Sequence, residues 1–550
     1  MTNKELADLI FPNVTKTIED YEKMYPERDL PEGAVVSRFA PSPTGFVHMG
    51  SLRSAFIARK VPKDTHGVFF LRIEDTDGAR TVENGIQGII DDLRNFNITI
   101  DEGVISETEQ IGGYGPYIQS QRKEIYETFA KHLIEQGMAY PCFCSSEEID
   151  EIRQMQELNK ERIGYYGSYA KCRFLTNEER AERIKNGEPY IIRLKSPGDF
   201  NKKIVLNDLV RGKIEFPEND LDIVIIKSDG LPLYHFAHLV DDHLMRTTHV
   251  IRGDEWISST PVHLQLFQVF GFKPPKYAHL GTVMKVDENG TRRKLSKRKD
   301  PEAAVSYYHQ KGIPVEAVNL YLMTIANTNF EAWWDQNQTL GIDDFKFDFK
   351  KMSVSGSLFD LEKLMNISKS YISRLKASEV YTRLLDWAKE FDSEFATILE
   401  NHKEYATAIF NIEREQKKPR KDYASFSTIK DCVWYMFDEY FHDHLEYQFG
   451  KIQDSKEIEL ILKTYLEKYY DEKDDKEVWF HKVKELSQEL GYCADMKLYK
   501  ENPDAYKGSV ADVSTVIRVA ATTSSMTPDL YEILKLLGKS RIEERFQKLY

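Results

Sequence analysis

The stretch VVSRFAPSPTGFVHMG, residues 35–50, decides the fold of this chain of 550 residues. Its β-branched start predicts a strand over Val35–Ala40, and a helix is expected from Gly50 to about Lys60. His48 and Gly50 therefore lie on a strand-to-helix turn, where free backbone N–H groups and the helix dipole favour an anion. A strand that leads into an anion-binding turn indicates a nucleotide fold.

A second segment supplies the positive charge that such an anion requires. The sequence KLSKR, residues 294–298, is a basic loop far along the chain. Lys294 and Lys297 bring two flexible ammonium groups, which suit a phosphate group. A polyphosphate held between a helix start and a distant lysine pair predicts nucleotide chemistry.

Strand and helix patterns alternate after residue 50, which predicts an α/β fold built from parallel βαβ units. A strand is expected over Val68–Ile73, and the next helix spaces Ile86, Ile89, Ile90 and Leu93 three and four apart. Another amphipathic helix is expected over Lys123–Gln136. Ligands of such folds bind at the carboxyl ends of the strands.

This alternation is interrupted around Cys142. Helix-like and strand-like segments follow up to about residue 225, namely 147–160, 190–194 and 203–206. The short apolar runs 223–226 and 249–252 are then expected to return to the parallel sheet as buried strands. Beyond about residue 365 the sequence is helical almost throughout, for example over 458–470 and over 530–537 before a C-capping Gly538.

The composition is that of a globular protein, with 41% hydrophobic and 30% charged residues. No apolar run reaches the roughly 20 residues that cross a bilayer, and the N-terminus lacks a secretory signal. Five cysteines do not make a disulfide framework, so the cytoplasm is the expected location. The net charge of −14 argues against indiscriminate coating of nucleic acid. It leaves RNA binding open, because local patches such as 417–421 and 292–294 decide electrostatic attraction, although 417–421 fits a solvated loop equally well.

The two segments arrive in the order and form of the "HIGH" and "KMSKS" signatures, so the chain resembles the class I aminoacyl-tRNA synthetases. Three further segments resemble the bacterial glutamyl-tRNA synthetases. They are RFAPSPTG (38–45), RIEDTD (72–77) and DGLPLYHFA (229–237). The resemblance runs from about Val35 to the C-terminus and is strongest up to about residue 365.

This resemblance implies a Rossmann-type parallel-sheet catalytic domain, an inserted acceptor-stem domain and an all-helical anticodon-binding region. The expected parts are an N-terminal extension without an assigned role (1–34), the first half of the catalytic domain (35–140), the acceptor-stem-binding insertion (141–222), the second catalytic half (223–305), a stem-contact connecting domain (306–365) and the anticodon-binding region (366–550).

The implied reaction is ATP-dependent ligation of L-glutamate to tRNA-Glu through a glutamyl-adenylate, with release of AMP and pyrophosphate. ATP and Mg²⁺ are the implied cofactors, and Mg²⁺ is expected to be held mainly by the nucleotide. L-glutamate and tRNA-Glu are the implied partners of a monomer without a membrane contact. Such chemistry requires the carboxylate in line with the α-phosphate and positive charge on the departing pyrophosphate.

Residue roles follow from the motifs that the family shares. The resemblance assigns catalysis and the phosphates to His48, Gly50, Lys294 and Lys297, with Lys297 the first choice for the developing charge. Glu255 and Trp256 resemble the residues beside the adenosine, so ATP is expected to contact these six positions. Ser51 departs from the commoner signature, in which a second histidine often stands.

Glutamate recognition requires a partner for a side-chain carboxylate, and guanidinium is the best-shaped donor. By the family match Arg38 binds the γ-carboxylate. The α-amino and α-carboxylate groups are expected to be surrounded by Ser42, Glu74, Tyr234 and Arg252. His238 stands where these enzymes usually carry an asparagine, and as a histidine its charge is expected to vary with pH.

Cys142, Cys144 and Cys172 resemble the zinc-binding insertion of some relatives. Three thiolates and a fourth ligand would suit tetrahedral zinc. The fourth ligand is not evident in the sequence, and reduced cytosolic thiols are the alternative. The positions considered are Phe174 and Ser168, where a histidine or tyrosine occurs in relatives, and the neighbouring Tyr166 and Tyr169.

Four alternatives compete with this interpretation. An enzyme that also charges tRNA-Gln with glutamate stays open, because no single residue of the helical tail decides the matter. A glutaminyl-tRNA synthetase is opposed by Arg38, by residues 72–77 and by the helical tail. A non-catalytic tRNA-binding paralogue would have lost His48 or Lys297, and a truncated relative that glutamylates a modified tRNA base would lack the anticodon-binding region.

Overall fold

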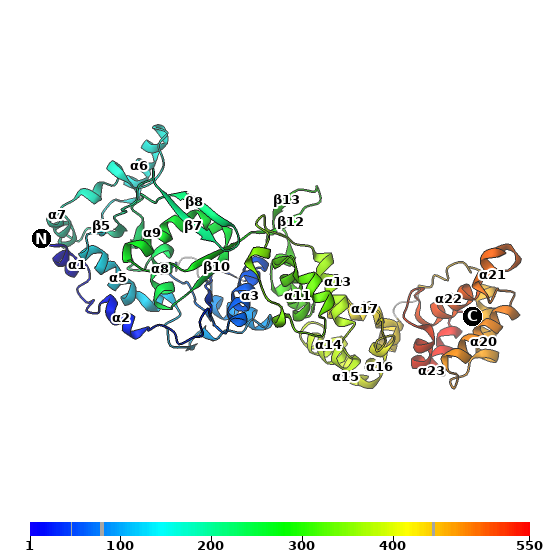
Figure 1. Cartoon of the computed structure of the whole chain (residues 1–550). Coiled ribbons are helices and arrows are strands. Elements are labelled where there is room, and N and C mark those ends of the chain that lie inside the picture. The colour runs from blue at the N-terminus through cyan, green and yellow to red at the C-terminus, as the bar shows by residue number, and fades with distance from the viewer. Residues whose placement is uncertain (46, 78–81, 297, 443–445) are drawn as a thin grey trace. The chain divides into compact units, whose positions relative to one another are not determined.

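The computed structural model describes residues 1–45, 47–77, 82–296, 298–442 and 446–550 (Figure 1). These residues form two compact units, which are residues 1–307 with 318–361 and residues 308–317 with 362–550. Within the described ranges, no helix is both long and apolar enough to cross a membrane.

The first unit is built on parallel strands. β1 (Val36–Phe39), β2 (Val68–Leu71) and β3 (Glu102–Val104) pair in parallel in that order, and β4 (Gln110–Ile111) adds an antiparallel edge. A second parallel pair consists of β10 (His249–Gly253) and β11 (Lys276–Leu280). It lies beside β1, where the Thr248 N–H donates to the Val36 carbonyl at 2.9 Å. The predicted parallel α/β fold is confirmed.

Helices follow these strands as the apolar spacing predicts. The helices of this part are α3 (Met49–Asp64), α4 (Gly85–Asn95), α5 (Lys123–Glu135), α8 (Tyr234–Leu244) and α9 (Thr260–Phe270). In α4 the buried residues are Ile89, Ile90 and Leu93, which share one stripe. α3 packs against β1 and β2, so its N-terminus faces the carboxyl ends of the strands.

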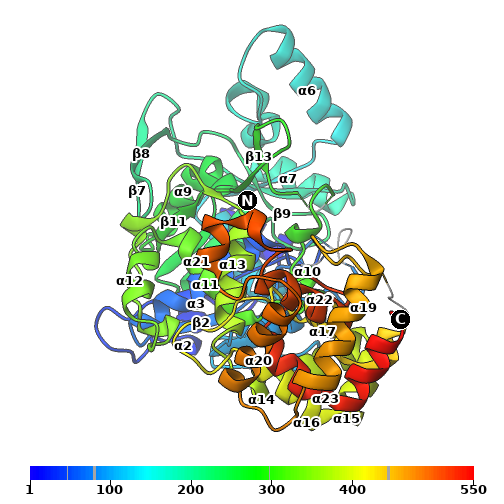
Figure 2. The ribbon, with the colours of Figure 1, turned by 90° about the vertical axis from the view of Figure 1, so that its right-hand side faces the viewer.

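A separate antiparallel sheet interrupts the parallel one. β5 (Ala139–Cys142) pairs with β6 (Ile191–Leu194), which also pairs with β9 (Val224–Ile226). The hairpin β7 (Lys203–Asp208) and β8 (Gly212–Pro217), with helices α6 (Ser146–Leu158) and α7 (Asn177–Lys185), completes this part. α6 stands at its edge (Figures 1 and 2).

The position of β9 corrects one prediction. The apolar run 223–226 was expected to resume the parallel sheet, but β9 runs antiparallel beside β6. A short apolar run indicates a buried strand without identifying the neighbour with which it pairs. The register of β6 against β9 depends on contacts that are distant in sequence.

The N-terminal extension is part of the core of the first unit. α1 (Asn3–Ile10) and α2 (Ile18–Met24) pack against α5, and Leu6 and Tyr21 are buried in the same apolar cluster as Phe129. Arg28 then forms a bidentate ion pair with Glu102 at 2.8 and 3.0 Å. Residues 1–34, to which the sequence assigned no role, therefore bury apolar surface of the catalytic unit.

A small three-stranded sheet carries the basic segment. β12 (Val283–Val286) pairs antiparallel with β13 (Arg292–Lys294) and in parallel with β14 (Ser357–Leu358). Lys294 therefore ends a strand, whereas the sequence predicted a loop beginning at that residue. Lys297 lies outside the described residues. α12 (Phe330–Gln336) also belongs to this unit.

The second unit is helical in its described residues, as predicted from about residue 365. Its helices are α14 (Ala377–Phe391), α15 (Ser393–Asn401), α16 (Lys403–Asn411), α17 (Ile429–Val433), α18 (Asp438–Phe441), α19 (Ser455–Thr464), α20 (Lys476–Glu489), α21 (Met496–Glu501), α22 (Val510–Thr522) and α23 (Leu530–Gln547). α10 (Ser306–Gln310), α11 (Val315–Ala326) and α13 (Leu361–Ile372) contain residues of both units. Gly538, at φ +73°, kinks α23 where the sequence predicted a helix end.

Candidate functional site

A cavity of about 760 Å³ lies at the carboxyl ends of the parallel strands in the first unit. Most of the residues assigned to the site line this cavity: Arg38, Ser42, His48, Gly50, Glu74, Tyr234, Arg252, Glu255, Trp256 and Lys294. They come from segments as distant as β1 and β13, which the fold brings together. His238 is not among the lining residues, and Lys297 is outside the described part of the chain.

The start of α3 is organised around His48. His48 is the N-cap, and its Nδ1 accepts a 3.1 Å hydrogen bond from the Ser51 backbone N–H. The Ser51 hydroxyl lies 3.0 Å from Nε2 of the same ring. A Cβ atom at Gly50 would lie 3.1 Å from the ring, so a glycine at this position leaves room for the imidazole. Ser51, which departs from the common signature, therefore helps to hold His48.

Arg53 is a cavity residue that the sequence analysis missed. It is 3% exposed on α3, and its guanidinium donates to the Ser357 hydroxyl at 2.8 Å and to the Gly281 carbonyl. Burial lowers the pKa of Arg53 to about 10. Nothing local distinguishes this arginine from one on a solvated helix face, because its partners lie more than 200 positions away.

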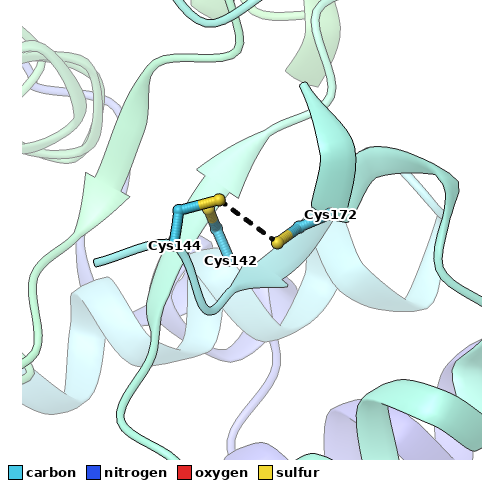
Figure 3. A group of neighbouring side chains, drawn as sticks. All are labelled: Cys142, Cys144 and Cys172. Carbon is cyan, nitrogen blue, oxygen red and sulfur yellow. Dashed lines mark hydrogen bonds between the residues drawn. The ribbon is translucent and has the colours of Figure 1, made fainter. Parts of the chain in front are cut away.

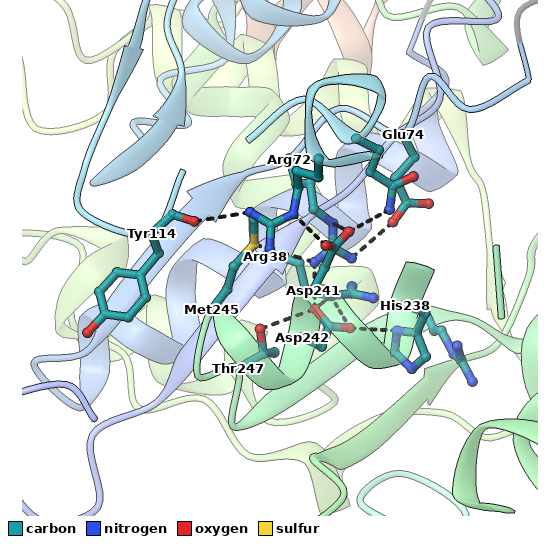
Figure 4. Close-up of polar contacts among 12 residues, drawn as sticks. Arg38, Arg72, Glu74, Tyr114, His238, Asp241, Asp242, Met245 and Thr247 are labelled. Carbon is teal, nitrogen blue, oxygen red and sulfur yellow. Dashed lines mark hydrogen bonds and ion pairs between the residues drawn. The ribbon is translucent and has the colours of Figure 1, made fainter. Parts of the chain in front are cut away.

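The wall that carries Arg38 is a network of buried charges (Figure 4). The Arg38 Nε lies 3.2 Å from Oδ1 of Asp242, and Arg72 donates to the same carboxylate at 2.8 Å. Arg72 also donates to Glu74 at 3.0 Å. Burial alone would raise the pKa of Asp242, but the two guanidinium groups hold it well below its usual range.

This network leaves the outer end of Arg38 available to a ligand. Within the described residues, the Arg38 Nη atoms make no hydrogen bond to the protein, while Nε is fixed by Asp242. Glu74 is 8% exposed at the cavity, and burial raises its pKa even though Arg72 and Arg38 oppose that shift. A cation and an anion thus lie on the same wall.

A second layer of charge supports the first. Asp241 accepts hydrogen bonds from Arg122 at 2.6 Å, from Gln119 at 2.9 Å and from the Tyr126 hydroxyl at 2.8 Å. Arg72 lies between the two aspartates, with its Nε 3.8 Å from Asp241. Buried charges of this kind persist because each finds an opposite charge and hydrogen bonds.

Arg252, from β10, lines the cavity together with Tyr234 and Trp256. Arg252 donates to the Tyr234 hydroxyl at 3.3 Å, and the Tyr234 and Trp256 rings lie 4.2 Å apart between centroids. Both aromatic residues and Arg252 line the cavity. A ligand in this cavity can therefore meet both Arg38 and Arg252.

His238 lies behind the cavity. Its Nδ1 is 2.5 Å from Oδ2 of Asp242, and its Nε2 is 3.0 Å from the Tyr277 hydroxyl. Burial lowers the pKa of His238 to about 3, so the expectation that its charge varies with pH near neutrality is wrong. His238 therefore contacts Asp242, and Asp242 in turn binds Arg38 of the cavity wall.

The basic segment is tied down by a buried acid that the sequence analysis missed. Asp300 is 2% exposed and accepts from both terminal nitrogens of Arg293, at 2.6 and 2.7 Å. The Ser296 backbone N–H donates to the same carboxylate at 2.9 Å. Hydrogen bonding from Arg293 is the main cause that lowers the pKa of Asp300. Lys294 and Ser296, on either side of Leu295, line the cavity.

Comparison with known proteins places this site in a family. Residues 34–366 match the model of the tRNA synthetases class I (E and Q), catalytic domain. The chain belongs to this family. The synthetase resemblance predicted from the motifs is confirmed, and the matched region contains the whole described lining of the cavity.

Relatives of this synthetase match it over nearly their full length. A glutamate--tRNA ligase of Clostridium perfringens is 48% identical over 550 residues, which cover 100% of this chain and 99% of that one. A glutamate--tRNA ligase of Acetivibrio thermocellus is 48% identical and covers 100% of both chains. The crystal structure of a glutamate tRNA ligase from Elizabethkingia meningosepticum in complex with its amino acid has a TM-score of 0.76 and 26% identity, over 94% of this chain and 99% of that chain.

The three cysteines of the synthetase meet outside the cavity (Figure 3). The sulfur atoms of Cys142, Cys144 and Cys172 all lie within 4.8 Å of one another. The Tyr165 hydroxyl is 3.2 Å from the Cys144 sulfur and 3.5 Å from that of Cys142. Hydrogen bonding among the thiols lowers the pKa of Cys142 and raises that of Cys144.

The Tyr165 hydroxyl thus contacts two of the three thiols, and Tyr165 is not among the positions proposed from the sequence. Phe174 is 68% exposed, and the Tyr166 hydroxyl donates to the Arg162 carbonyl. The Tyr169 hydroxyl donates to Glu161. The family resemblance pointed to other positions, and the turn that brings Tyr165 back to the thiols has no local signal in the sequence.

Proposed function

We propose that this protein is a glutamate--tRNA ligase, which joins L-glutamate to tRNA-Glu at the expense of ATP. One observation carries the proposal: a single cavity is lined by two arginines, Arg38 and Arg252, and by the carboxylate of Glu74. Glutamate has two carboxylates and one ammonium group, so this set of charges complements it. The relatives that align over their full length are named for the same activity.

The amino acid is recognised at three points. Arg38 takes the γ-carboxylate through its Nη atoms, because Asp242 already occupies Nε. Glu74 and Ser42 face the α-ammonium group, and Arg252 with Tyr234 faces the α-carboxylate. Glutamine would place an uncharged amide against Arg38, which leaves a buried cation poorly compensated.

The nucleotide lies along the other part of the cavity. The N-terminus of α3 at His48 and Gly50 attracts the phosphates, and Lys294 adds charge from β13. Glu255 and Trp256 receive the adenosine. Mg²⁺, held mainly by the phosphates, would neutralise charge on the departing pyrophosphate. We also assign Lys297 to this charge, on the family resemblance alone.

The reaction runs in two steps. An oxygen of the glutamate α-carboxylate attacks the α-phosphorus of ATP, and the bond from that phosphorus to the bridging oxygen of pyrophosphate breaks. A ribose hydroxyl at the tRNA terminus then attacks the activated carbonyl carbon, and AMP leaves with the phosphate oxygen. The protein contributes position and charge rather than a covalent intermediate.

The tRNA contacts are proposed from the domain assignments. Residues 141–222 and 306–365 would contact the acceptor stem, and the helical residues 366–550 would contact the anticodon. Charging of tRNA-Gln, the monomeric state and a cytoplasmic location stay predictions. The N-terminal residues 1–34 stabilise the catalytic unit in this proposal.

We include a structural zinc ion in the proposal. Cys142, Cys144, Cys172 and the Tyr165 hydroxyl would hold it, since three clustered thiols and one oxygen give a four-coordinate donor set. When bound, zinc would link β5 to the turn that contains Cys172 and so stabilise the fold of this part.

Pyrophosphate exchange tests the first step. The purified protein should exchange label between pyrophosphate and ATP when glutamate is present, and the family resemblance implies that bound tRNA-Glu is required. Glutamine should not replace glutamate. Absence of exchange with glutamate and tRNA-Glu together would refute the proposal, and strong exchange without tRNA would refute its tRNA requirement.

A further inference from the structure

Arg252 is hydrogen-bonded to two buried histidines, His263 and His279, which no motif predicted. Its Nε lies 3.0 Å from Nε2 of His279, whose Nδ1 is 2.7 Å from the Asp208 carboxylate. Its Nη2 lies 3.1 Å from Nδ1 of His263, whose Nε2 is 2.9 Å from Nδ1 of His235. His263 and His279 are both fully buried.

The chemistry of guanidinium determines which ring nitrogens of His263 and His279 carry a proton. Arginine carries only donors, so the two imidazole nitrogens that face Arg252 must be acceptors and carry no proton. The His279 proton is then on Nδ1, where it is donated to Asp208. The His263 proton is on Nε2, where it is donated to His235. Both rings are neutral, each in one tautomer.

These histidine contacts also determine which N–H groups of Arg252 a ligand can meet. Of the five N–H groups of a guanidinium, Nε is used by His279, and Nη2 donates to both His263 and Thr260, the latter at 3.2 Å. One N–H of Nη1 donates to the Tyr234 hydroxyl at 3.3 Å. In the described part of the chain the second N–H of Nη1 has no hydrogen-bond partner, and the neighbouring Tyr234 lines the cavity.

We propose that His263 and His279 are positioning residues that aim Nη1 of Arg252, together with the Tyr234 hydroxyl, at the α-carboxylate of the substrate. This inference rests on the proposed function, because it takes glutamate as the ligand of Arg252. Neither histidine touches the substrate. Each acts by accepting from the guanidinium, so a side chain of similar shape that lacks the acceptor cannot replace it.

The surroundings keep both rings neutral. Burial lowers the pKa of His263 and of His279, and the charge of Arg252 lowers both further. His235 and His238 on α8 also face His263, while Arg211 and Asp208 face His279. Burial likewise lowers the pKa of His235. Protonation of either acceptor would turn an N–H toward the guanidinium and break its hydrogen bond to Arg252.

The tautomers can be read directly in the full-length protein. Nitrogen NMR of protein labelled at histidine, with signals assigned through His263→Asn and His279→Gln, distinguishes protonated from unprotonated ring nitrogens. We expect His263 protonated at Nε2 and His279 protonated at Nδ1, both unchanged between pH 8 and pH 6. The opposite tautomer or a charged ring at either position would overturn the inference. This measurement is independent of the enzymatic activity.

Variants test the consequence for the substrate. His263→Leu and His279→Leu should raise the glutamate KM by about 10-fold to 100-fold, because hydrogen bonds to a charged group are lost, and should leave the ATP KM unchanged. His263→Asn places an acceptor where Nδ1 stood, and His279→Gln places one where Nε2 stood. Each should recover most of the loss.

The control is His243→Leu, which removes another part-buried imidazole, one that contacts Glu22 and stacks on Phe272. It should leave the glutamate KM at the wild-type value. Wild-type KM values in the leucine variants, or equal losses in the leucine and amide variants, would refute the positioning role. If a leucine variant fails to fold, the amide variants and the tautomers decide. Failure of the wild type to use glutamate would instead refute the proposed function.

Discussion

Arg38 meets Asp242 through Nε alone, which leaves the Nη atoms toward the cavity. Arg38→Ala should therefore lower kcat/KM for glutamate by about 10²-fold to 10⁴-fold, the equivalent of the roughly 3–5 kcal/mol lost when one partner of a buried pair is removed. The preference for glutamate over glutamine should shrink with it. Steady-state kinetics with both amino acids measures the effect.

Arg38→Lys is the informative companion to this substitution. Lysine keeps the charge but lacks both the planar fork and an Nε for Asp242, so it should restore activity only in part. An alanine variant that kept the wild-type preference for glutamate would show that Arg38 does not select the substrate. Arg252 would then be the next residue to test.

Asp242 balances two arginines in the core, so its loss should affect stability as well as activity. Asp242→Asn should lower the free energy of unfolding at pH 7 by about 3–5 kcal/mol, because Arg38 and Arg72 keep their charges without the shared carboxylate. Denaturant unfolding at a series of pH values measures this loss.

The pH dependence of this effect has a definite sign. The pKa of Asp242 is lower in the folded protein than its usual value, so its stabilisation is complete above about pH 4 and is lost as pH falls further toward the folded pKa. The variant should thus lose less stability than the wild type below about pH 4. Asp91→Asn, at an exposed residue paired with Arg94, is the control. Its stability should match that of the wild type at every pH. Parallel curves for Asp242→Asn and wild type would contradict the account.

At the start of α3, glycine at position 50 makes room for the His48 ring. In Gly50→Ala the new Cβ would lie 3.1 Å from two ring atoms, so the imidazole must move. We expect kcat to fall by about tenfold or more, while the melting temperature stays the same or rises, since alanine is the better helix former. Kinetics and thermal unfolding of the same preparation separate the two effects.

Gly88→Ala on α4 provides the matched control. A Cβ atom there would meet nothing within 4 Å, so this change should raise stability by up to about 1 kcal/mol and leave kcat unchanged. Wild-type turnover in Gly50→Ala would show that the place of the His48 ring is not important to the reaction.

The segment between β5 and Cys172 carries the zinc prediction. Metal analysis of the purified protein should find one zinc ion per chain, and Cys144→Ser should remove most of it and lower the melting temperature, because the ion links distant parts of this segment. Cys432→Ser, at a half-buried thiol of the helical unit, is the control. Protein without zinc that has the same stability and activity as the metal-loaded form would contradict the assignment.

Elements with a strong local signal were predictable from the sequence, and those defined by distant contacts were not. The stripe of Ile89, Ile90 and Leu93 and the position of His48 on the turn before α3 depend on neighbours within a few residues. The pairing of β9 with β6 depends on residues 30 or more positions apart, and a short apolar run does not encode it.

The residues of the site also differ in whether they could be predicted from local sequence or only from distant contacts. The motifs identified Arg38, Glu74, Tyr234 and Arg252 because each stands in a recognisable segment. The groups that hold them were missed, among them Asp242 and His279, because a buried acid or histidine has no sequence pattern of its own. Their roles arise only when β1, α8 and β11 come together.

Charge at the scale of the whole chain bears on tRNA binding. The net charge is −14, so attraction to a tRNA must come from local basic surfaces rather than from the protein as a whole. This fits an enzyme that binds one class of nucleic acid at a defined surface. Which tRNA is aminoacylated does not follow from the net charge and must be measured on the full-length protein.

Aminoacylation of purified tRNA-Glu and tRNA-Gln side by side, with labelled glutamate or labelled glutamine, tests the central claim most directly. We predict that the full-length protein attaches glutamate to tRNA-Glu in an ATP-dependent reaction and attaches no glutamine to either tRNA. Glutamine bound to tRNA at a comparable rate, or no glutamate on tRNA-Glu, would contradict the account.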